Sequence, residues 1–445
     1  MTSKSRKHFV ACGLADALLA GPPGITEFEA RAKQALGRKP RWVLPLCKRI
    51  FARFGSGLGT QQRAKLIEFI ETDQGYLDAW LADTKPRIRH YFLATNSMAP
   101  RVGALALCPL PNIPTSVDLA AWLDISIEDL EWFADVRHMV KAPGPLCHYH
   151  FRWLPKRSGG WRLVEIPKQR LRDLQRKILR EVLDPVMPHD AAHGFRRGRS
   201  CLTNAAPHCG KDVVLRMDLL NFFTSIPASR IHALFTTLGY PDPVAKRLTG
   251  LCTCEVTTRM LPALPAGAEP LPWAMRKRYA ERHLPQGAPT SPALANLCAL
   301  HLDFRLAGLA ESLGGAYTRY ADDLAISGGE PLRRRVGAIT SLLSAIAREQ
   351  KFDINHRKTR VMHRSDRQRL TGVVVNEKPN VSRAEFDQLK AVLHNCVVHG
   401  PQSQNRMGHP NFREHLRGRV SYVAGLNGAR GERLRLAFEE IDWAR

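Results

Sequence analysis

Ala316–Ser327, which reads AYTRYADDLAIS, decides the fold of this 445-residue chain. Apolar, β-branched and aromatic residues on both sides of Asp322 and Asp323 predict two short strands that meet in a tight turn, with the carboxylates at the hairpin tip. Adjacent carboxylates raise each other's pKa unless a cation neutralises them, and a divalent metal ion is the obvious candidate. Asp-Asp is also a common turn dipeptide, so the pair alone leaves a purely structural turn open.

A second apolar segment, Lys211–Phe223, carries a carboxylate at Asp218, 104 residues before Asp322. Two strands that each present an Asp at the end could together hold two Mg²⁺ ions roughly 3.5–4 Å apart. In phosphoryl transfer such a pair of ions activates the attacking hydroxyl and neutralises the leaving pyrophosphate. Between the two strands lies Leu284–Asn296, whose Pro and Gly residues predict a tight turn that leads into a helix.

The charge of the chain predicts a polyanionic partner. Lys and Arg number 66 against 41 Asp and Glu, a net charge of +25. The excess is clustered, because residues 151–200 contain 13 basic and 5 acidic residues and residues 351–370 contain 7 and 2. Nucleic acid is the commonest partner of such a protein, and its binding should weaken steeply with salt. A solvated basic surface is the alternative, which the clustering disfavours.

Composition argues against several other classes of protein. No apolar run approaches the 18 residues of a membrane span, and the N-terminal sequence is a poor secretory signal, so we expect a cytoplasmic protein with no membrane partner. The ten cysteines show no CxxC spacing and are expected to be reduced. Cys147–His150 contains metal-ligand residue types but has no second half-site, so zinc is not expected there.

The first 145 residues are predicted to form a helical, basic N-terminal extension. Thr26 and Glu29 form a possible capping box, and residues 61–73 show helical spacing of apolar side chains. Residues 118–133 read as two short helices with a helix-turn-helix appearance. Because that segment is acidic, its apolar residues are better explained as core than as part of a DNA reader.

From His150 onward the pattern changes to mixed strand and helix. Residues 152–167 predict a hairpin with a Ser-Gly-Gly turn, and residues 168–183 predict a helix with one apolar face. Residues 251–283 are rich in Pro and Ala and are interpreted as an inserted loop. Residues 382–445 are again predicted to be helical, with a polar break around residues 400–410.

Five segments, taken in order, resemble the motifs of bacterial retron-type reverse transcriptases over about residues 150–380. They are Trp161–Val164, the strand that carries Asp218, Leu284–Pro292, Tyr320–Asp323 and Asn355–Thr359. Three further segments favour the retron branch. Asn204–His208 resembles its Asn-Ala-x-x-His signature, Leu370–Gly372 resembles its Val-Thr-Gly signature with Leu in place of Val, and His415–Asn427 is similar to the terminal thumb.

The resemblance implies an α+β right-hand polymerase. Fingers and a palm with an antiparallel sheet would span residues 146–380, and a helical RNA-binding thumb would span residues 381–445. The implied activity is RNA-directed DNA synthesis from deoxynucleoside triphosphates on a dedicated structured noncoding RNA. An internal guanosine 2′-hydroxyl would prime it, giving a branched RNA–DNA product, the multicopy single-stranded DNA. Two Mg²⁺ ions, with Mn²⁺ as a substitute, a separate effector protein and a role in antiphage defence are also implied.

The resemblance also assigns catalytic and nucleotide-binding residues. Asp218, Asp322 and Asp323 would be the catalytic, metal-binding set, with the first two doing most of the metal binding. Lys358 would be the general acid for pyrophosphate, with a solvated lysine as the alternative. The expected nucleotide contacts are Lys156 or Arg157 with Arg162 at the triphosphate, Gln286 at the sugar, Tyr320, and Phe223 or its neighbour Phe222 as the block against a ribose 2′-hydroxyl.

One of the two phenylalanines is expected to be simple core packing. The RNA contacts are expected at Asn204, His208, Leu370, Thr371, Gly372, Arg417 and Arg419, and recognition of stem-loops should depend on shape. For Asn204 and His208 a structural hydrogen-bonded pair is the alternative.

Three other functions remain as rivals. One is another bacterial reverse transcriptase, such as a group II intron protein or a CRISPR-linked or other defence enzyme. A second is a noncatalytic RNA-binding scaffold, which would be expected to lose the carboxylates that this chain keeps at Asp218, Asp322 and Asp323. The third is an RNA-copying RNA polymerase, which Phe222 and Phe223 disfavour because they would obstruct ribonucleotides.

Overall fold

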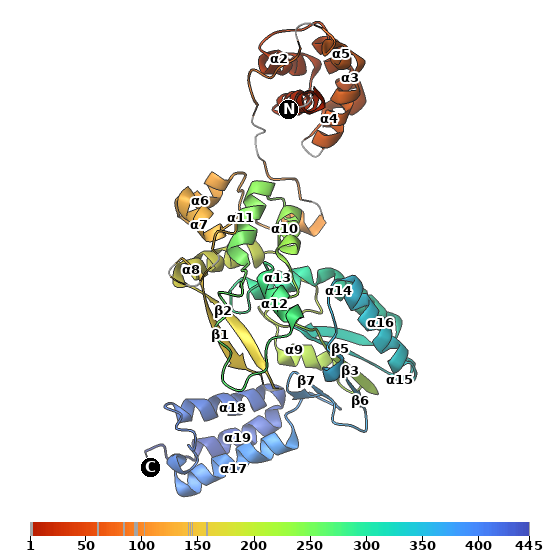
Figure 1. Ribbon diagram of the computed structural model, residues 1–445. Coiled ribbons are helices and arrows are strands. Elements are labelled where there is room, and N and C mark those ends of the chain that lie inside the picture. Colours follow the sequence, from red (N-terminus) through yellow and green to blue (C-terminus); the bar gives the residue numbers. More distant parts are fainter. Residues whose placement is uncertain are drawn as a thin grey trace. The chain divides into compact units, whose positions relative to one another are not determined.

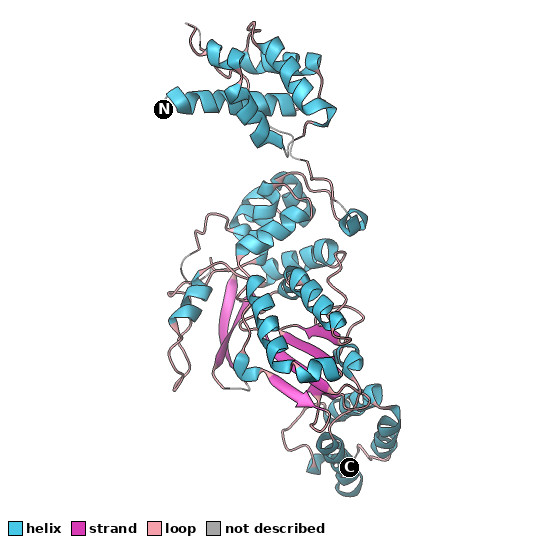
Figure 2. Ribbon diagram, turned by 90° about the vertical axis from the view of Figure 1, so that its right-hand side faces the viewer, coloured by secondary structure: helices cyan, strands magenta, loops and turns pink. Residues whose placement is uncertain are grey.

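The computed structural model describes residues 3–59, 62–82, 85–92, 97–101, 103–140, 142, 144, 146–156 and 159–444. Its contacts divide the chain into two compact units, Met1–Ser97 and Met98–Arg445. Helices dominate both units, and the strands form small antiparallel sheets in the second unit only, as Figures 1 and 2 show for the described residues. This architecture agrees with the expected α+β class.

The first unit is a helical bundle with a core of its own. Its elements are α1 (Ser3–Leu19), α2 (Ile25–Leu36), α3 (Val43–Phe54), a 3₁₀ turn (Gly55–Gly57), α4 (Arg63–Thr72) and α5 (Gln74–Ala79). Phe28, Leu46 and Tyr76 are among the side chains buried between them. The helix expected over residues 61–73 is confirmed as α4. The capping box is wrong, because α2 begins one residue before Thr26 with Gly24 as its N-cap.

The compact N-terminal unit ends at Ser97, whereas the sequence suggested a division near residue 145. The segment in between belongs to the second unit and contains a 3₁₀ turn (Gly103–Leu107), α6 (Ser116–Leu123) and α7 (Ile127–Ala134). Leu119, Leu130 and Phe133 from these helices enter the main core, and both helices contact α11 (Asp242–Cys252). The apolar residues of the helix-turn-helix-like segment are therefore core residues, as the sequence favoured.

A four-stranded antiparallel sheet holds the motif residues. Its order is β4 (Ala316–Tyr320), β5 (Asp323–Gly328), β3 (Val213–Asp218) and β6 (Arg360–His363). The hairpin expected around the Asp-Asp pair is confirmed, with Tyr320 opposite Asp323. Strand β5 also pairs with β3 in a register that sets Asp218 opposite Asp323. The predicted carboxylates therefore meet at one end of the sheet.

A second hairpin and a set of helices surround this sheet. The hairpin is confirmed as β1 (Tyr149–Pro155) with β2 (Trp161–Pro167), and the helix expected next is α8 (Gln169–Ile178), which continues into a π-helical turn (Leu179–Leu183). The remaining helices are α9 (Cys201–Ala205), α10 (Ala228–Thr237), α12 (Trp273–Ala280), α13 (Ser291–Cys298), α14 (Leu300–Ser312), α15 (Glu330–Arg334) and α16 (Val336–Glu349), with 3₁₀ turns at Ala206–His208 and His356–Lys358.

Helix α12 corrects the interpretation of residues 251–283 as a loop throughout. Tyr279 on this helix is buried in the main core, where its ring lies 6.4 Å from that of Trp153. Its carbonyl also accepts a hydrogen bond from the Val256 backbone amide at 2.7 Å. This tertiary packing outweighs the weak helical signal of the surrounding Pro-rich sequence.

The C-terminal part of the second unit is a three-helix bundle. After the short strands β7 (Arg369–Leu370) and β8 (Val373–Val374) come α17 (Arg383–His399), a 3₁₀ turn (Pro401–Ser403), α18 (Phe412–Leu426) and α19 (Gly428–Glu439). Leu393, Leu416 and Leu434 lie in its separate core. The break expected around residues 400–410 is confirmed.

No single helix in the described part of the chain is long and apolar enough to cross a membrane. Helices α13 and α14 meet the length and composition test only as a pair, with a bend of 52° between them.

Candidate active site

The carboxylates predicted from the sequence meet at the turn between β4 and β5. Ala321 adopts a left-handed backbone with φ of 58°, which turns the chain directly before Asp322. The backbone amide of Leu219 donates to the Asp322 carbonyl at 2.8 Å and fixes the turn against the end of β3. Asp218 stands opposite Asp323 in the same sheet. Residues 104 apart in the sequence are thus held side by side.

Two of the three carboxylates have a cationic partner. The Arg216 Nη2 atom donates to both Asp323 oxygens at 2.8 and 2.9 Å, and the Lys358 Nζ atom lies 3.0 Å from both oxygens of Asp218. Burial, together with the charges of Asp218 and Asp323, raises the pKa of Asp322 to about 6. The negative charge at this turn is therefore incompletely neutralised. Carboxylate oxygens that carry this uncompensated negative charge are suitable ligands for a divalent cation such as Mg²⁺.

A buried ion pair supports the turn from behind. Arg319, with no exposed surface, donates to both oxygens of Asp303 at 2.8 and 2.6 Å and to the Asn296 side chain at 2.9 Å. It also donates to the Ala321 carbonyl at 3.1 Å, within the turn itself. The sequence interpretation missed this residue, although a basic residue inside an apolar strand is a usable signal, since buried charges require partners.

The segment around Gly194 packs against the same turn. A side chain at Gly194 would bring a Cβ within 2.5 Å of the Ala321 amide nitrogen, so only glycine allows this approach. The Asn296 side chain donates to the Gly194 carbonyl at 2.9 Å. The next residue, Phe195, has φ of 60° and is 54% exposed, and its ring lies 6.2 Å from that of Phe223. This exposed aromatic side chain was also missed.

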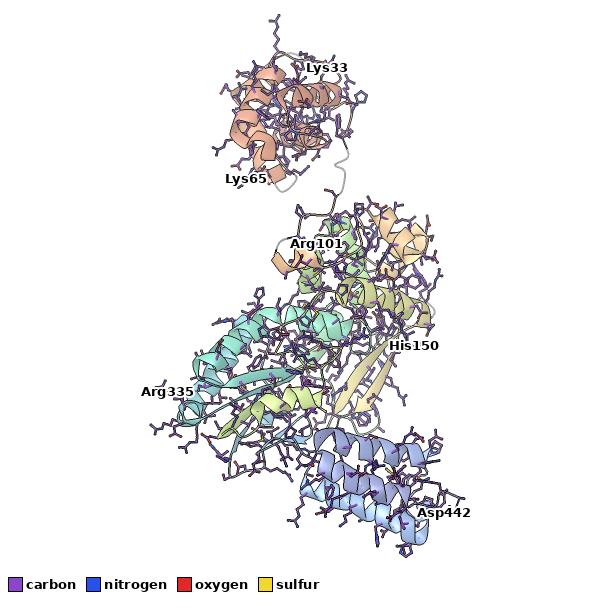
Figure 3. All side chains as sticks on the ribbon, turned by 180° about the vertical axis from the view of Figure 1, so that it is seen from behind. Lys33, Lys65, Arg101, His150, Arg335 and Asp442 are labelled. Carbon is purple, nitrogen blue, oxygen red and sulfur yellow. The ribbon has the colours of Figure 1, made fainter. Side chains whose placement is uncertain are left out.

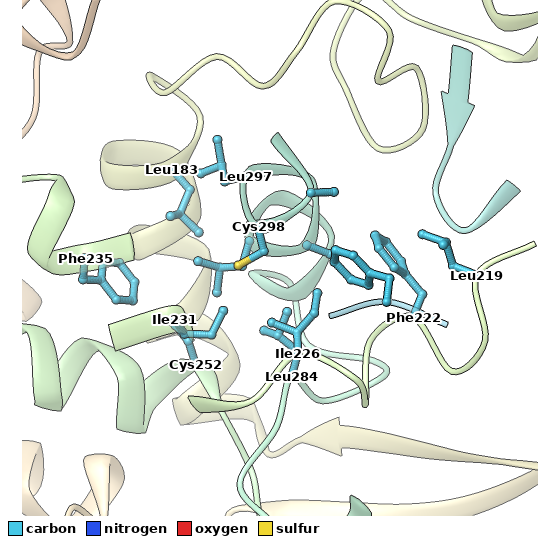
Figure 4. Close-up of a cluster of buried hydrophobic side chains, with 14 of the residues drawn as sticks. Leu183, Leu219, Phe222, Ile226, Ile231, Phe235, Cys252, Leu284, Leu297 and Cys298 are labelled. Atoms are coloured by element: carbon cyan, nitrogen blue, oxygen red, sulfur yellow. The ribbon is translucent and has the colours of Figure 1, made fainter. Parts of the chain in front are cut away.

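The structure distinguishes Phe222 from Phe223, the two candidates for the block against a ribose 2′-hydroxyl. Phe222 is buried, with its ring 5.7 Å from that of Phe352, and lies among the apolar side chains of the main core (Figure 4). Phe223 is half-buried and faces Phe195 at the edge of that core. Phe222 is therefore the packing residue of the pair, and Phe223 is the one with a free surface.

The predicted triphosphate contacts lie on the β1–β2 hairpin. Burial lowers the pKa of Lys156, and the positive charges of Arg162 and Lys358 lower it further, so these three cations share one electropositive region. Arg162 is exposed on β2. Arg157, the alternative to Lys156, lies outside the described residues.

The expected nucleotide contact Gln286 is tied to β2 through its backbone. Its amide donates to the Glu165 Oε2 atom at 2.7 Å, and its carbonyl accepts from the Glu165 amide at 3.0 Å. A Cβ on the following residue, Gly287, would lie 2.7 Å from the Glu165 carbonyl, which requires glycine for this close approach. Gln286 and Arg162 are therefore held by the same strand.

Glu165 belongs to a buried polar cluster that sequence reasoning missed. Its Oε1 atom lies 2.8 Å from the His283 Nε2 atom and accepts from the Cys254 thiol at 3.1 Å. Burial opposes a charge on His283, but the Glu165 carboxylate outweighs it and raises the histidine pKa. In the described residues this trio alone brings three metal-ligand side chains within 4.8 Å of one another. Its short contact between Glu165 and His283 is that of a hydrogen-bonded ion pair.

Three of the expected RNA contacts are buried, which corrects that interpretation. His208 has no exposed surface and bonds to the Ser327 and Thr318 hydroxyls at 2.7 and 2.8 Å, and burial lowers its pKa to about 3. Asn204 is also buried and donates to the Thr371 hydroxyl at 3.4 Å. Leu370 lies in an apolar cluster beside the sheet. Asn204 and His208 are therefore structural, but their side chains bond to hydroxyl groups of other residues and not, as the paired alternative had expected, to each other.

The other expected RNA contacts have accessible surface. Thr371 and Gly372 form the half-buried turn between β7 and β8, where the Gly372 carbonyl accepts from Arg369 at 3.2 Å. On α18, Arg417 is exposed and Arg419 is half-buried. Tyr320, at the end of β4, is half-buried beside the carboxylates.

Comparisons with known proteins agree with this site. Residues 154–375 match the family described as reverse transcriptase (RNA-dependent DNA polymerase). The retron Mx65 reverse transcriptase of Myxococcus xanthus is 40% identical over 337 residues, covering 76% of this chain and 74% of that protein. The retron Ec86 reverse transcriptase of Escherichia coli is 32% identical over 332 residues, covering 73% and 88% respectively.

The stretch that matches the family, residues 154–375, includes the four-stranded sheet, the carboxylate turn and most of the helices around them. Reverse transcriptases use divalent metal ions, in keeping with the incompletely neutralised carboxylates described above. The chain therefore belongs to the retron reverse transcriptases and is an RNA-directed DNA polymerase.

Proposed function

We propose that this enzyme copies part of a dedicated structured noncoding RNA into branched, multicopy single-stranded DNA. Synthesis would begin at the 2′-hydroxyl of a guanosine within that RNA and would use deoxynucleoside triphosphates. The observation that carries the proposal is the turn at which Asp218, Asp322 and Asp323 meet with one carboxylate held at a raised pKa. The retron relatives support the choice of RNA partner.

Asp218 and Asp322 are the proposed principal metal ligands. Each of Asp218 and Asp323 has both oxygens on a cation, Lys358 and Arg216 respectively, so the choice of Asp218 over Asp323 follows the family pattern. Two bound Mg²⁺ ions, replaceable by Mn²⁺, would activate the attacking hydroxyl and neutralise pyrophosphate. Lys358, now 3.0 Å from Asp218, would be freed when a cation takes over that carboxylate, and could then donate its proton to the leaving pyrophosphate.

The incoming nucleotide would lie between the β1–β2 hairpin and the carboxylates. Arg162 and Lys156 would hold its phosphates, because both cations face the region of Lys358. Gln286 would contact the sugar from the loop that Glu165 holds, and Tyr320 would be a further nucleotide contact. Phe223 would exclude a ribose 2′-hydroxyl by its bulk and by offering no hydrogen-bond partner.

The architecture fits a right-hand polymerase. In this assignment the β1–β2 hairpin belongs to the fingers, the four-stranded sheet is the palm, and α17–α19 form the thumb. Thr371, Gly372, Arg417 and Arg419 are the proposed RNA contacts that retain accessible surface. A separate effector protein and a role in antiphage defence complete the proposal, by analogy with the family.

Two measurements test this function. Sequencing the nucleic acid that copurifies with the protein should reveal an RNA joined to DNA through a 2′,5′ branch, whereas linear products alone would contradict the priming proposal. Asp322→Asn should abolish deoxynucleotide incorporation while RNA binding persists. The matched control Asp184→Asn removes an exposed carboxylate and should leave synthesis unchanged. Synthesis by the Asp322 variant would overturn the catalytic assignment.

A further inference from the structure

The exposed face of α3, in the first unit, carries several cations. Arg41 in the turn before the helix, Lys48, and Arg53 in its last turn are all exposed. Arg49 is exposed beside them. At about 100° per residue, Lys48, Arg49 and Arg53 fall on the side of the helix opposite the buried Val43 and Cys47. Arg53 lies at the edge of that side, seven residues after the buried Leu46. The outward face of this helix is therefore basic along its whole length.

This charge is not balanced by neighbouring acids. Residues 30–67 contain ten Lys and Arg residues and no Asp or Glu. Acids from outside the stretch pair with Lys39, Arg49 and Arg63. Within the described part of the chain, by contrast, no carboxylate forms an ion pair with Arg41, Lys48 or Arg53. The like charges of Arg41, before the helix, and of Lys48 and Arg53 on it repel one another unless a polyanion binds there.

The other free cations of this stretch do not extend the same surface. Lys33 and Lys65 lie at opposite ends of the unit (Figure 3). A hollow of about 450 Å³ instead adjoins the α3 face, with Trp42, Pro45 and Phe69 on its apolar side. Its polar side is formed by Arg49, Thr72, Asp73, Gln74 and Gly75, and the Asp73 carboxylate there is neutralised by Arg49. Trp42 is half-buried, with its ring 5.6 Å from that of Tyr76. A basic face beside an aromatic-lined hollow is the combination that binds unpaired nucleotides.

We propose that the α3 face, defined by Arg41, Lys48 and Arg53, binds a single-stranded segment of RNA, with a base entering the hollow beside Trp42. The inference rests on the proposed function for its choice of RNA, since the enzyme must hold an RNA while copying it. The cations would contact the phosphates, and the aromatic hollow would favour unpaired over duplex RNA. The first unit is then an RNA-binding module separate from the polymerase site.

The test measures binding of a 30-nucleotide oligouridylate to the full-length protein between 0.05 and 0.4 M KCl. The variant R41A/K48A/R53A removes three proposed phosphate contacts. For this variant the slope of log affinity against log salt concentration should be shallower by about 2, and binding at 0.15 M KCl should be roughly 50-fold weaker. The control R6A/R335A/R348A removes the same charge from other exposed positions and should keep the wild-type slope.

Each outcome bears on the proposal. An unchanged slope for the α3 variant, or an equal change in the control, overturns it. An equal loss of affinity for an RNA duplex of the same length overturns the preference for unpaired nucleotides. Both variants should retain DNA synthesis on polyadenylate primed with oligothymidylate. Copurifying nucleic acid without a branched RNA–DNA product contradicts the proposed function, while the binding result still decides the role of α3.

Discussion

Replacing Asp322 by Asn should stabilise the protein even as it removes activity. Burial and two neighbouring carboxylates raise the pKa of Asp322 from 3.8 to about 6. An acid whose pKa rises on folding favours its protonated form in the folded state, so ionisation opposes folding once the pH exceeds the unfolded value. The free-energy cost that ionised Asp322 adds to folding is nil below about pH 3.8, grows between about pH 4 and 6, and reaches its full value above about pH 6. Asparagine carries no charge and avoids it at every pH.

The size of the effect follows from the shift of about two pKa units. At 1.36 kcal/mol per unit the cost is about 3 kcal/mol at pH 8, and roughly half of that at pH 5. The unfolding entropy of about 2.1 cal/mol/K per residue converts 3 kcal/mol into a rise of about 4 °C in the midpoint for the second unit, Met98–Arg445.

Scanning calorimetry of the metal-free protein would measure this difference. We expect the Asp322→Asn midpoint to exceed the wild-type midpoint at pH 8, by a margin that shrinks at pH 5. Millimolar Mg²⁺ should raise the wild-type midpoint and narrow the gap. Asp184→Asn, at an exposed site, should match the wild type. An equal or lower midpoint for Asp322→Asn at pH 8, or a margin independent of pH, would refute the electrostatic reasoning.

Four other substitutions probe the site. Phe223→Ala should raise ribonucleotide incorporation in primer extension, whereas Phe222→Ala should cost about 3–5 kcal/mol of stability and leave sugar choice unchanged; the reverse pattern would exchange their roles. Glu165→Gln should raise the KM for deoxynucleotides several-fold with little change in kcat, because it weakens the clamp on the nucleotide loop, and an unaltered KM would exclude that role. Arg319→Met should cost about 3–5 kcal/mol in urea unfolding by leaving Asp303 charged and unpaired, and a neutral result would mean that the pair is dispensable.

The sequence was sufficient for features that depend on local pattern or on the order of motifs. The hairpin at Asp322 and the strand that ends at Asp218 follow from apolar residues broken by carboxylates at strand ends. Their meeting could be expected because both strands belong to one family pattern. The C-terminal helices with their polar break follow from helical spacing and capping, as at Ser382.

Other features depend on contacts that no local pattern encodes. Phe222 and Phe223 are neighbours of equal chemistry, and only packing against Phe352 distinguishes them. Glu165 and His283 are 118 residues apart, so their ion pair emerges only in the folded chain. The hydrogen bonds that bury His208 join it to strands more than 100 residues away.

The separate core of the first unit has a consequence for how the chain unfolds. Its buried cluster draws only on residues before Ser97, so heating should melt this unit and the polymerase unit in two transitions, each with its own midpoint. A single free energy of unfolding is then undefined for the whole chain. The melting of the first unit supplies an internal reference, unmoved by Asp322→Asn or Mg²⁺, against which shifts in the second transition can be read. Bound RNA should move both transitions only if α3 also contacts it.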